Sequence, residues 1–222
     1  MNLHIIAVME ECTMTKMLHI CVTPRGAKSR TLKITNTFLE TFKKRHPECE
    51  IDTIDLFSEK LPEINLDVTD GKYLLMAGGE ISDRLKPAWQ EIERHIARFL
   101  SADIYLISCP MWNFSIPYRL KHYIDIIAQP KYLFRYTEHG VEGLAKNKKM
   151  LVIASRGGNY SPESPLRSFD HQEPYLRTVF GFLGITDITF IIAQPTDALG
   201  AEIMLERISA AQNEAKRLAE SL

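Results

Sequence analysis

Five short strand-like segments, separated by longer stretches with a helical period, constrain the fold of this chain more than any other feature. Residues 18–23, 103–109, 150–154 and 188–193 are mainly apolar, and apolar and polar residues alternate in 50–56. These patterns predict five strands, of which 103–109 is nearly all apolar and therefore buried on both faces. The helical stretches are residues 31–46, 87–100, 118–128 and 174–183, with a last one through 204–218. This alternation predicts an α/β fold with a doubly wound parallel sheet and helices on both faces.

The length and composition of the chain favour a single domain. With 222 residues, of which 45% are hydrophobic and 25% are charged, the chain can bury one sizeable core. Residues 57–80 are of mixed character and contain three glycines, so we interpret them as a long excursion. Met17 stands directly before the first strand. We therefore interpret residues 1–16 as an N-terminal extension, from an upstream start codon, and residues 17–222 as the domain.

Charge, hydropathy and cysteine spacing exclude several classes of function. The net charge of −1 gives no basis for binding nucleic acid or an anionic membrane. No segment approaches the 18 apolar residues of a membrane span, so we expect a soluble protein. The four cysteines form no C-x-x-C pair, as expected for reduced thiols in the cytoplasm. The histidines match no metal motif and no catalytic triad, so we expect neither a catalytic metal nor a nucleophilic side chain.

The loops after the first, third and fourth strands should meet at one place. In doubly wound sheets, ligands bind outside the carboxyl ends of the strands, where the strand order reverses. The first of these loops, residues 23–31, carries the hydroxyls of Thr23, Ser29 and Thr31 and three basic side chains, and it opens directly into a helix. Hydroxyls and free amides at a helix start favour a phosphate group. The loop lacks both G-x-x-x-x-G-K-[ST] and G-x-G-x-x-G, so it suits a phosphomonoester. The alternative is a polar turn with Ser29 as an ordinary N-cap.

The other two loops carry residues suited to a flat aromatic ring. In residues 110–117, Trp112 and Phe114 can flank such a ring and Asn113 can meet its polar edge, unless the loop only packs against the core. In residues 155–160, the pair Gly157 and Gly158 lets the backbone approach a ligand closely, unless the loop is only a flexible turn.

From Met17 onward the chain resembles the FMN-dependent NADH-azoreductase family, within the flavodoxin-like quinone reductases. The resemblance rests on residues 23–31, 110–114, 134–140, 142–144, 155–158 and 180–187. It implies strand order 2-1-3-4-5 and a tightly bound FMN. The implied phosphate ligands are Thr23, Ser29, Arg30 and Thr31; the isoalloxazine is lined by Met111, Trp112, Asn113 and Phe114, and its far edge meets Ser155, Arg156, Gly157 and Gly158.

The resemblance also implies a reaction and an assembly. A reduced nicotinamide, NADH or NADPH, would pass a hydride to flavin N5, and a quinone or azo acceptor would then take it in a ping-pong cycle. Gly157, Gly158 and Arg156 are candidates to stabilise the N1–C2 carbonyl edge. The family works as a homodimer, and Tyr136 matches a position bordering the site. Trp112 stands where tyrosine is frequent and Tyr160 where some members carry histidine, which bears on the choice of acceptor.

Three alternatives to this enzyme stay open from the sequence. The first is a flavodoxin-type electron carrier that does not turn over nicotinamide. The second is an FAD-dependent quinone reductase. The third is an interaction protein that binds no flavin. The flavin released on denaturation, together with steady oxidation of NAD(P)H by menadione, distinguishes these alternatives.

Overall fold

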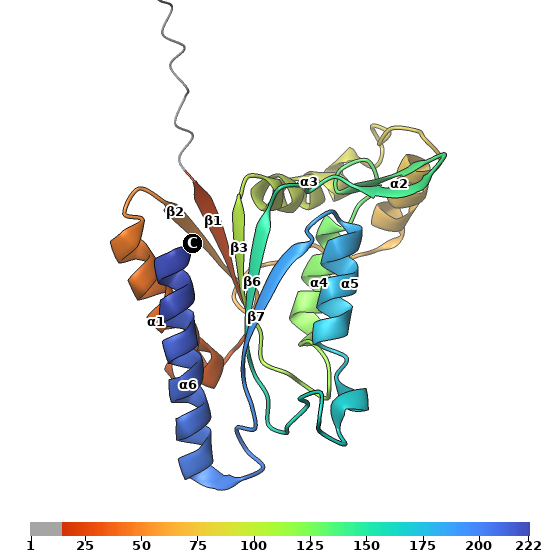
Figure 1. Cartoon of the computed structure of the whole chain (residues 1–222). Helices are drawn as coiled ribbons and strands as arrows, with labels where there is room; N and C mark the ends of the chain where they lie inside the picture. Colours follow the sequence, from red (N-terminus) through yellow and green to blue (C-terminus); the bar gives the residue numbers. More distant parts are fainter. Residues whose placement is uncertain (1–14) are drawn as a thin grey trace, which may run out of the picture.

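The computed structural model describes residues 15–222 and contains a five-stranded parallel sheet. Its strands are β1 (Lys16–Cys21), β2 (Glu50–Asp55), β3 (Ile104–Ser108), β6 (Lys149–Ser155) and β7 (Asp187–Ala193). They lie in the order β2-β1-β3-β6-β7, which confirms the predicted order 2-1-3-4-5 when the strands of this sheet are counted along the chain (Figure 1). Most of the predicted extension lies outside the described residues. Lys16, which we had assigned to that extension, belongs to β1 and pairs with Glu50.

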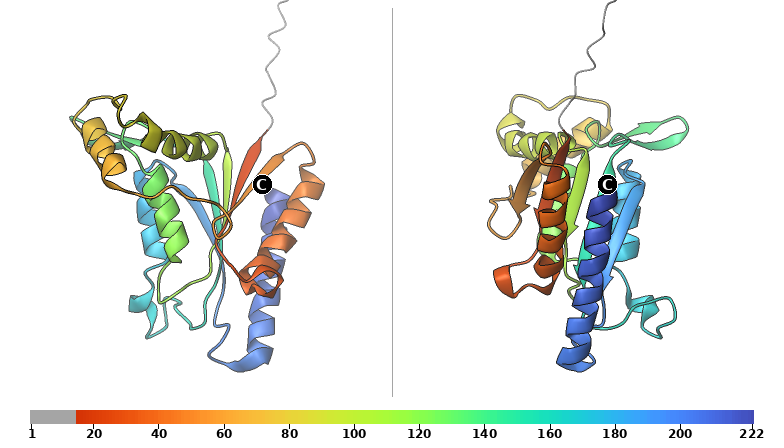
Figure 2. Two further views of the ribbon diagram at one scale, coloured as in Figure 1. Left: turned by 180° about the vertical axis from the view of Figure 1, so that it is seen from behind. Right: turned by 60° about the vertical axis from the view of Figure 1, so that its left-hand side comes forward.

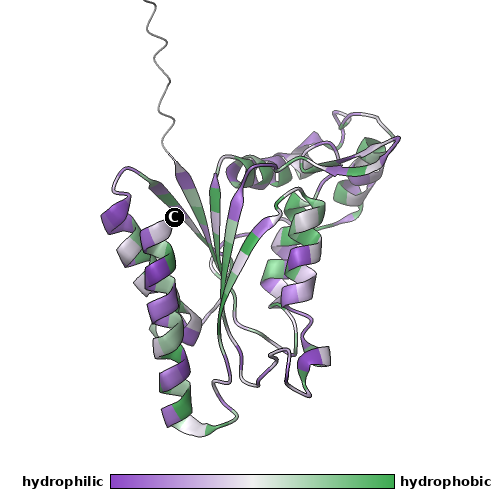
Figure 3. Ribbon diagram, viewed as in Figure 1, coloured by the Kyte–Doolittle hydropathy of each residue, from purple (hydrophilic) through white to green (hydrophobic). Residues whose placement is uncertain are grey.

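Helices cover both faces of the sheet. On one face, α1 (Arg30–Arg45) packs beside α6 (Gly200–Ser221), and Figure 2 shows the two side by side. The other face carries α3 (Lys86–Leu100), α4 (Tyr118–Ile127) and α5 (Glu173–Phe182). The helical period in the sequence predicted each of these helices. Figure 3 shows that their apolar residues gather toward the sheet.

Each face of the sheet has its own apolar core. Under α1 and α6 the core includes Phe38, Leu106 and Ile153, and Ala211, Ala215 and Ala219 present a row of small residues on α6. The opposite core is larger and is built mainly from β1, β3 and the helices of that face. Neighbouring residues of β1, such as Met17 and Leu18, belong to different cores because side chains alternate along a strand.

Two elements were missed by the sequence analysis. The excursion at 57–80 contains α2 (Leu66–Met76), whose first turn is capped by Asn65 through a bond from Val68 N. Gly71 interrupts the helical pattern there because a Cβ at that position would lie 2.1 Å from Trp89 Nε1. The second element is an antiparallel hairpin of β4 (Phe134–Thr137) and β5 (Gly140–Gly143). Glycine is needed at Gly143 because a Cβ would meet the backbone of Gly184 at 2.2 Å.

The two ends of the sheet differ. The loops after β1, β3 and β6 lie together at the end where the strands finish, at the bottom of Figure 1. Helices α2 and α3 and the β4–β5 hairpin lie at the opposite end. None of the helices in residues 15–222 is both long enough and apolar enough to cross a membrane.

Candidate functional site

The loop after β1 forms a polar cradle at the start of α1. A short 3₁₀ turn, η1 (Gly26–Lys28), leads into the helix, and Ser29 Oγ caps it by accepting from Leu32 N at 3.3 Å. The N-cap interpretation of Ser29 is therefore correct, but it leaves the hydroxyl proton of Ser29 available. Within the described residues, the backbone N–H groups of Arg30 and Thr31 donate no hydrogen bond to the protein. Two amides and two hydroxyls, those of Ser29 and Thr23, thus remain to bind an anion.

The three predicted loops meet at one cavity, together with a fourth loop that the sequence analysis missed. The cavity has a volume of about 210 Å³. Its lining contains Thr23, Arg25, Ser29, Arg30, Pro110, Met111, Trp112, Ser155, Gly157, Thr196 and Asp197. Thr196 and Asp197 follow β7, where the only sequence signal was the presence of polar residues at a strand end. Larger cavities exist, and one of about 760 Å³ lies between α3 and Lys131, but it contains no predicted site residue.

The guanidinium of Arg30 lies at this cavity and already forms an ion pair with a carboxylate of the protein. Its Nη1 lies 2.6 Å from Asp197 Oδ1 and donates to Thr196 Oγ1 at 3.2 Å. The carboxylate offsets much of the positive charge that the loop brings to the cavity. An anion bound here would therefore depend on the hydroxyls, the free amides and the helix dipole more than on net charge.

Thr31 lies behind the cavity rather than in its wall. Its side chain is buried and its hydroxyl shares a hydrogen bond with Ser155 Oγ at 2.8 Å. A row of polar groups continues inward, because Thr35 Oγ1 lies 2.7 Å from Ser108 Oγ and Ser108 Oγ lies 2.8 Å from His19 Nε2. Burial lowers the pKa of His19 to about 4, so its ring is neutral near pH 7. The hydroxyl of Thr31 therefore lies outside the cavity lining and shares a hydrogen bond with Ser155; its role as a phosphate donor stays a prediction, and its amide is free.

The loop after β3 forms a strained turn that presents two aromatic side chains. Trp112 and Ser115 exchange backbone hydrogen bonds of 2.9 and 3.0 Å. Between them, Asn113 has φ 47° and Phe114 has φ 71°, as in a type I′ turn, in which glycine is favoured at the second position. Phe114 is 47% exposed and Trp112 is also exposed, so the interpretation of these side chains as core packing is wrong. A second cavity, of about 530 Å³, lies on the α4 side of Trp112.

A Cβ at either of the two glycines after β6 would crowd the end of a neighbouring side chain. A Cβ on Gly157 would lie 2.9 Å from Asp197 Oδ2, and one on Gly158 would lie 3.1 Å from the hydroxyl of Tyr160. Neither glycine adopts the left-handed backbone. Within the described residues, the backbone N–H groups of these two glycines donate no hydrogen bond to the protein. Both are therefore free to bind a ligand.

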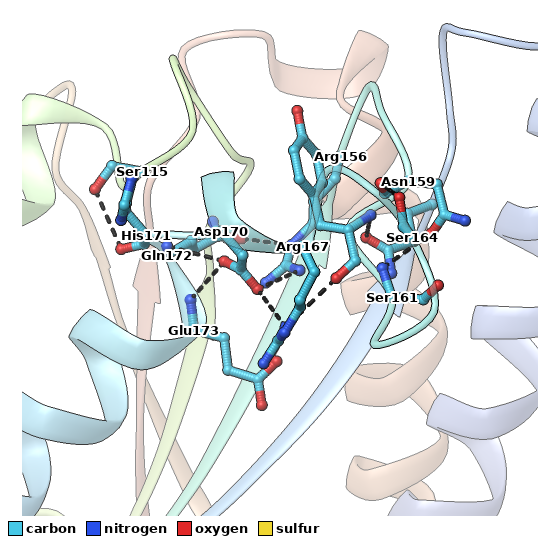
Figure 4. A network of polar contacts seen from close by, with 12 residues as sticks. Ser115, Arg156, Asn159, Ser161, Ser164, Arg167, Asp170, His171, Gln172 and Glu173 are labelled. Atoms are coloured by element: carbon cyan, nitrogen blue, oxygen red, sulfur yellow. Dashed lines mark hydrogen bonds and ion pairs between the residues drawn. The ribbon is translucent and has the colours of Figure 1, made fainter.

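Arg156, a candidate to stabilise the carbonyl edge of a bound ring, has a side chain that is only 1% exposed. Nη1 of Arg156 lies 3.0 Å from Asp170 Oδ2, and its Nε donates to Gln172 Oε1 at 2.9 Å (Figure 4). Burial lowers the pKa of this guanidinium, and Asp170 opposes the shift. The side chain therefore belongs to the support of the site and not to its surface.

Nothing in residues 15–222 suggests a metal or a reactive thiol. No group of three or more metal-ligating side chains occurs among those residues. The cysteines described there, Cys21, Cys49 and Cys109, are all buried and free. Burial raises the pKa of Cys109, beneath the aromatic turn, to about 12, so it is a neutral thiol at physiological pH.

Comparisons with known proteins agree with this geometry. The profile of a protein family described as a flavodoxin-like fold matches residues 15–219. An FMN-dependent NADH:quinone oxidoreductase of Rhizobium meliloti (strain 1021) is 44% identical over 180 residues, 81% of this chain and 85% of the relative. One of Nitratidesulfovibrio vulgaris (strain Hildenborough) is 35% identical over 206 residues, 93% of this chain and 99% of the relative.

Two solved structures are also similar to the chain. An FMN-dependent NADH-azoreductase from Bacillus anthracis str. Ames Ancestor, in complex with FMN, is 31% identical with a TM-score of 0.81. That match covers 93% of this chain and all of the other. An azoreductase from Bacillus anthracis str. Sterne has a TM-score of 0.86 at 28% identity, with 94% of this chain and all of the other covered.

Proposed function

This chain belongs to the flavodoxin-like family that includes the FMN-dependent NADH:quinone oxidoreductases, and we propose that it binds FMN and reduces quinones or azo compounds with NADH or NADPH. The observation that carries the proposal is the meeting of free helix amides, hydroxyls that keep a proton to donate and an exposed aromatic turn at one cavity. Bound FMN would supply the redox chemistry, taking a hydride from the nicotinamide and giving it to the acceptor in a ping-pong cycle.

The phosphate would be held by the start of α1. Thr23 and Ser29 each have a hydroxyl proton to donate, and the amides of Arg30 and Thr31 point out of the first turn of the helix. Arg30 would contribute through its guanidinium while keeping Asp197 as a partner. Hydrogen bonds to a charged group are stronger than neutral ones, so these four donors are sufficient for a phosphomonoester.

The flavin ring would lie between the aromatic turn and the glycine loop. Trp112 and Phe114 offer apolar surface for its faces, and Met111 and Asn113 complete that side. The free amides of Gly157 and Gly158 would donate to the carbonyl edge of the ring, where negative charge collects on reduction. Apolar walls exclude water, which strengthens these hydrogen bonds.

The experiment that tests this function starts from the purified full chain. Denaturation should release a flavin with the mass of FMN, and the native protein should oxidise NADH or NADPH steadily with menadione as acceptor. FAD in the released fraction would favour the FAD-dependent alternative. Bound FMN without nicotinamide oxidation would favour the electron carrier, and a protein that takes up no flavin in titration would favour an interaction protein.

A homodimer with sites at the subunit interface is part of the same proposal. Tyr136 is 57% exposed on the β4–β5 hairpin, at the opposite end of the sheet from the cavity. It cannot border the cavity of its own subunit, so a two-fold arrangement that places the hairpin against the partner's aromatic turn accounts for its position. Val141 and Phe182 are also exposed. Large apolar groups gathered at a surface mark an interface.

Sedimentation at micromolar concentration tests the dimer. We expect a dimer whose association is strengthened by FMN, because ligand binding and assembly are then linked. Tyr136→Ala should lower quinone reduction without unfolding the chain. A monomer with bound FMN and full activity would exclude a shared site. A cytoplasmic location also stays a prediction, to be checked by cell fractionation.

A further inference from the structure

A buried ion pair lies directly behind the glycine loop. The side chain of Arg156 is 1% exposed and that of Asp170 is 0% exposed, and their Nη1 and Oδ2 atoms are 3.0 Å apart. Arg167 approaches the same Oδ2 from the surface, also at 3.0 Å (Figure 4). The two partners lie on different segments, since Arg156 follows β6 and Asp170 precedes α5. The pair therefore joins two parts of the chain that no sheet hydrogen bond connects.

Asp170 and Arg156 extend this junction to two further elements. Asp170 Oδ1 accepts from the amides of Gln172 and Glu173, at 3.0 and 3.2 Å, and so fixes the first residues of α5. Gln172 accepts from Arg156 Nε and donates through Nε2 to the carbonyl oxygen of Cys109 at 3.1 Å. Cys109 directly follows β3 and leads into the aromatic turn between Trp112 and Ser115. Through Gln172, the network thus holds the end of β3.

A backbone hydrogen bond connects the network to the strained turn. His171 lies between the two network residues Asp170 and Gln172, and its N–H donates to the carbonyl oxygen of Phe114 at 2.9 Å. Phe114 has the left-handed backbone that a phenylalanine rarely adopts, and such a conformation persists only where surrounding contacts impose it. Among the described residues, His171 makes the backbone hydrogen bond that reaches Phe114 from outside the turn, and the rings of Phe169 and Tyr160 lie beside its side chain.

The same network fixes the glycine loop. Arg156 N donates to Ala193 O at 3.0 Å, and Arg156 O accepts from both the amide and the hydroxyl of Thr196 at 2.9 Å. With both its backbone and its guanidinium held, Arg156 determines where the chain enters Gly157. Residues of this network therefore contact both surfaces that would enclose the flavin ring.

We propose that Arg156 and Asp170 are positioning residues that hold the aromatic turn and the glycine loop in the one arrangement that fits the flavin ring, an inference that rests on the proposed function. A buried ion pair is a poor means of stabilising a fold, because apolar side chains of the same volume are often as stable or more so. The ion pair instead fixes the orientation of the side chains that it joins. The planar guanidinium sets two partners, Asp170 and Gln172, at fixed angles, which an apolar contact does not do.

The test compares variants of this pair with a second arginine–aspartate pair far from the site, whose side chains are each 22% exposed. Arg98 donates to both carboxylate oxygens of Asp52, at 2.8 and 2.6 Å, and joins α3 to β2. We expect Arg156→Met to weaken FMN binding by about tenfold or more, because a small misplacement of the ring contacts is costly. Arg98→Met should lower stability but leave the dissociation constant for FMN within about twofold of the wild-type value.

A second measurement on the apoprotein does not depend on flavin. In Arg156→Met, amide hydrogen exchange should be faster at His171 and Ser115, whose bonds define the turn, and unchanged at residues of α3. Asp170→Asn keeps an oxygen for the amides at the start of α5 but removes the charge. Like Arg156→Met, it should raise the exchange rates at His171 and Ser115 and lower the affinity for FMN. Arg156→Lys keeps the positive charge but not the planar guanidinium that binds two partners at once. It should therefore recover only part of the affinity for FMN that Arg156→Met loses.

The outcomes separate the two proposals. If the wild-type chain binds no FMN, the proposed function fails, and the exchange rates alone decide the positioning role. Wild-type exchange at His171 and Ser115 in Arg156→Met would overturn that role. So would a loss of FMN affinity no greater than that of Arg98→Met at equal loss of stability. If Arg156→Met does not fold, the same comparison is made on Arg156→Lys, for which wild-type affinity and exchange would overturn the inference.

Discussion

Replacing Phe114 by glycine should weaken flavin binding and leave the stability of the protein almost unchanged. Phe114 occupies the second central position of a type I′ turn with φ 71°, the position at which glycine is preferred. Its ring is 47% exposed and lies 5.4 Å from that of Phe169. The substitution therefore removes strain and a half-buried ring together, and the two effects act in opposite directions.

The magnitudes nearly cancel for stability. A side chain with a Cβ in the left-handed region costs about 1–2 kcal/mol, which glycine would release. Losing the buried half of a phenylalanine ring costs about 0.8–1.5 kcal/mol, from about 1.5–3 kcal/mol for full burial. The greater freedom of glycine in the unfolded chain costs about 0.5–1 kcal/mol more. The free energy of unfolding should thus stay within about 1.5 kcal/mol of the wild-type value.

Flavin affinity should fall much more. An aromatic side chain stacked on a heteroaromatic ring contributes about 1–3 kcal/mol, so the dissociation constant for FMN should rise from about fivefold to more than a hundredfold. Stability is measured by urea unfolding of the apoprotein and affinity by quenching of FMN fluorescence. Phe114→Ala is the control, because it removes the same ring but keeps the Cβ in the strained backbone. It should bind FMN as poorly as the glycine variant.

Two results would refute this reasoning. If Phe114→Ala is as stable as Phe114→Gly, the left-handed backbone does not store the strain that we assign to it. If Phe114→Gly binds FMN with wild-type affinity, the side chain takes no part in the site.

Thr23→Val removes one hydroxyl donor without disturbing the cap of α1, and should raise the FMN dissociation constant about tenfold or more at unchanged stability; an unchanged titration would exclude Thr23 from the phosphate site. Gly157→Val would place its Cβ 2.9 Å from Asp197 Oδ2, so the purified variant should retain little flavin; wild-type flavin content and turnover would contradict this. The neutral His19 has its pKa lowered from 6.5 to about 4, so the unfolded chain takes up the proton first as the pH falls. Stability should therefore fall by about 3 kcal/mol between pH 6.5 and pH 4. The His19→Asn variant should lose less free energy of unfolding over that pH range, as measured by urea unfolding. A loss equal to that of the wild type would mean that other groups control the pH dependence of stability.

Much of the fold could be predicted because local patterns and tertiary packing agree. β3 is almost wholly apolar and buried, the composition of a strand covered on both faces, whereas β2 alternates apolar and polar residues and is only partly buried. The helix ends also followed local rules, since Gly184 adopts the left-handed backbone just after α5. The topology rule then placed Thr23, Trp112 and Gly157 at one cavity from the order of the strands alone.

The elements that escaped prediction depend on contacts that local patterns do not record. Helix α2 has no clear apolar stripe, and its Gly71 is explained only by Trp89, which lies on another helix. The β4–β5 hairpin carries exposed Tyr136 and Val141, so it shows little of the alternation that marks a strand half-buried in its own subunit. Gly71 is thus explained by a residue outside its own helix, and Tyr136 and Val141, which pair with each other across the hairpin, both stay exposed.

The sequence by itself determined the class of fold and which loops meet, because buried strands, helical periods and right-handed crossovers admit few arrangements; the strand order came from the family resemblance. Only the tertiary structure decided where each residue of those loops lies. Ser29 and Thr31 are equivalent in the sequence as hydroxyls beside a basic residue, yet Ser29 lines the cavity and the hydroxyl of Thr31 lies behind it, hydrogen-bonded to Ser155. Arg156 had seemed a ligand for the flavin, but Asp170 lies beside it, so its charge is held in the interior. The direction of a side chain depends on the partners that packing brings to it, and those partners come from distant parts of the chain.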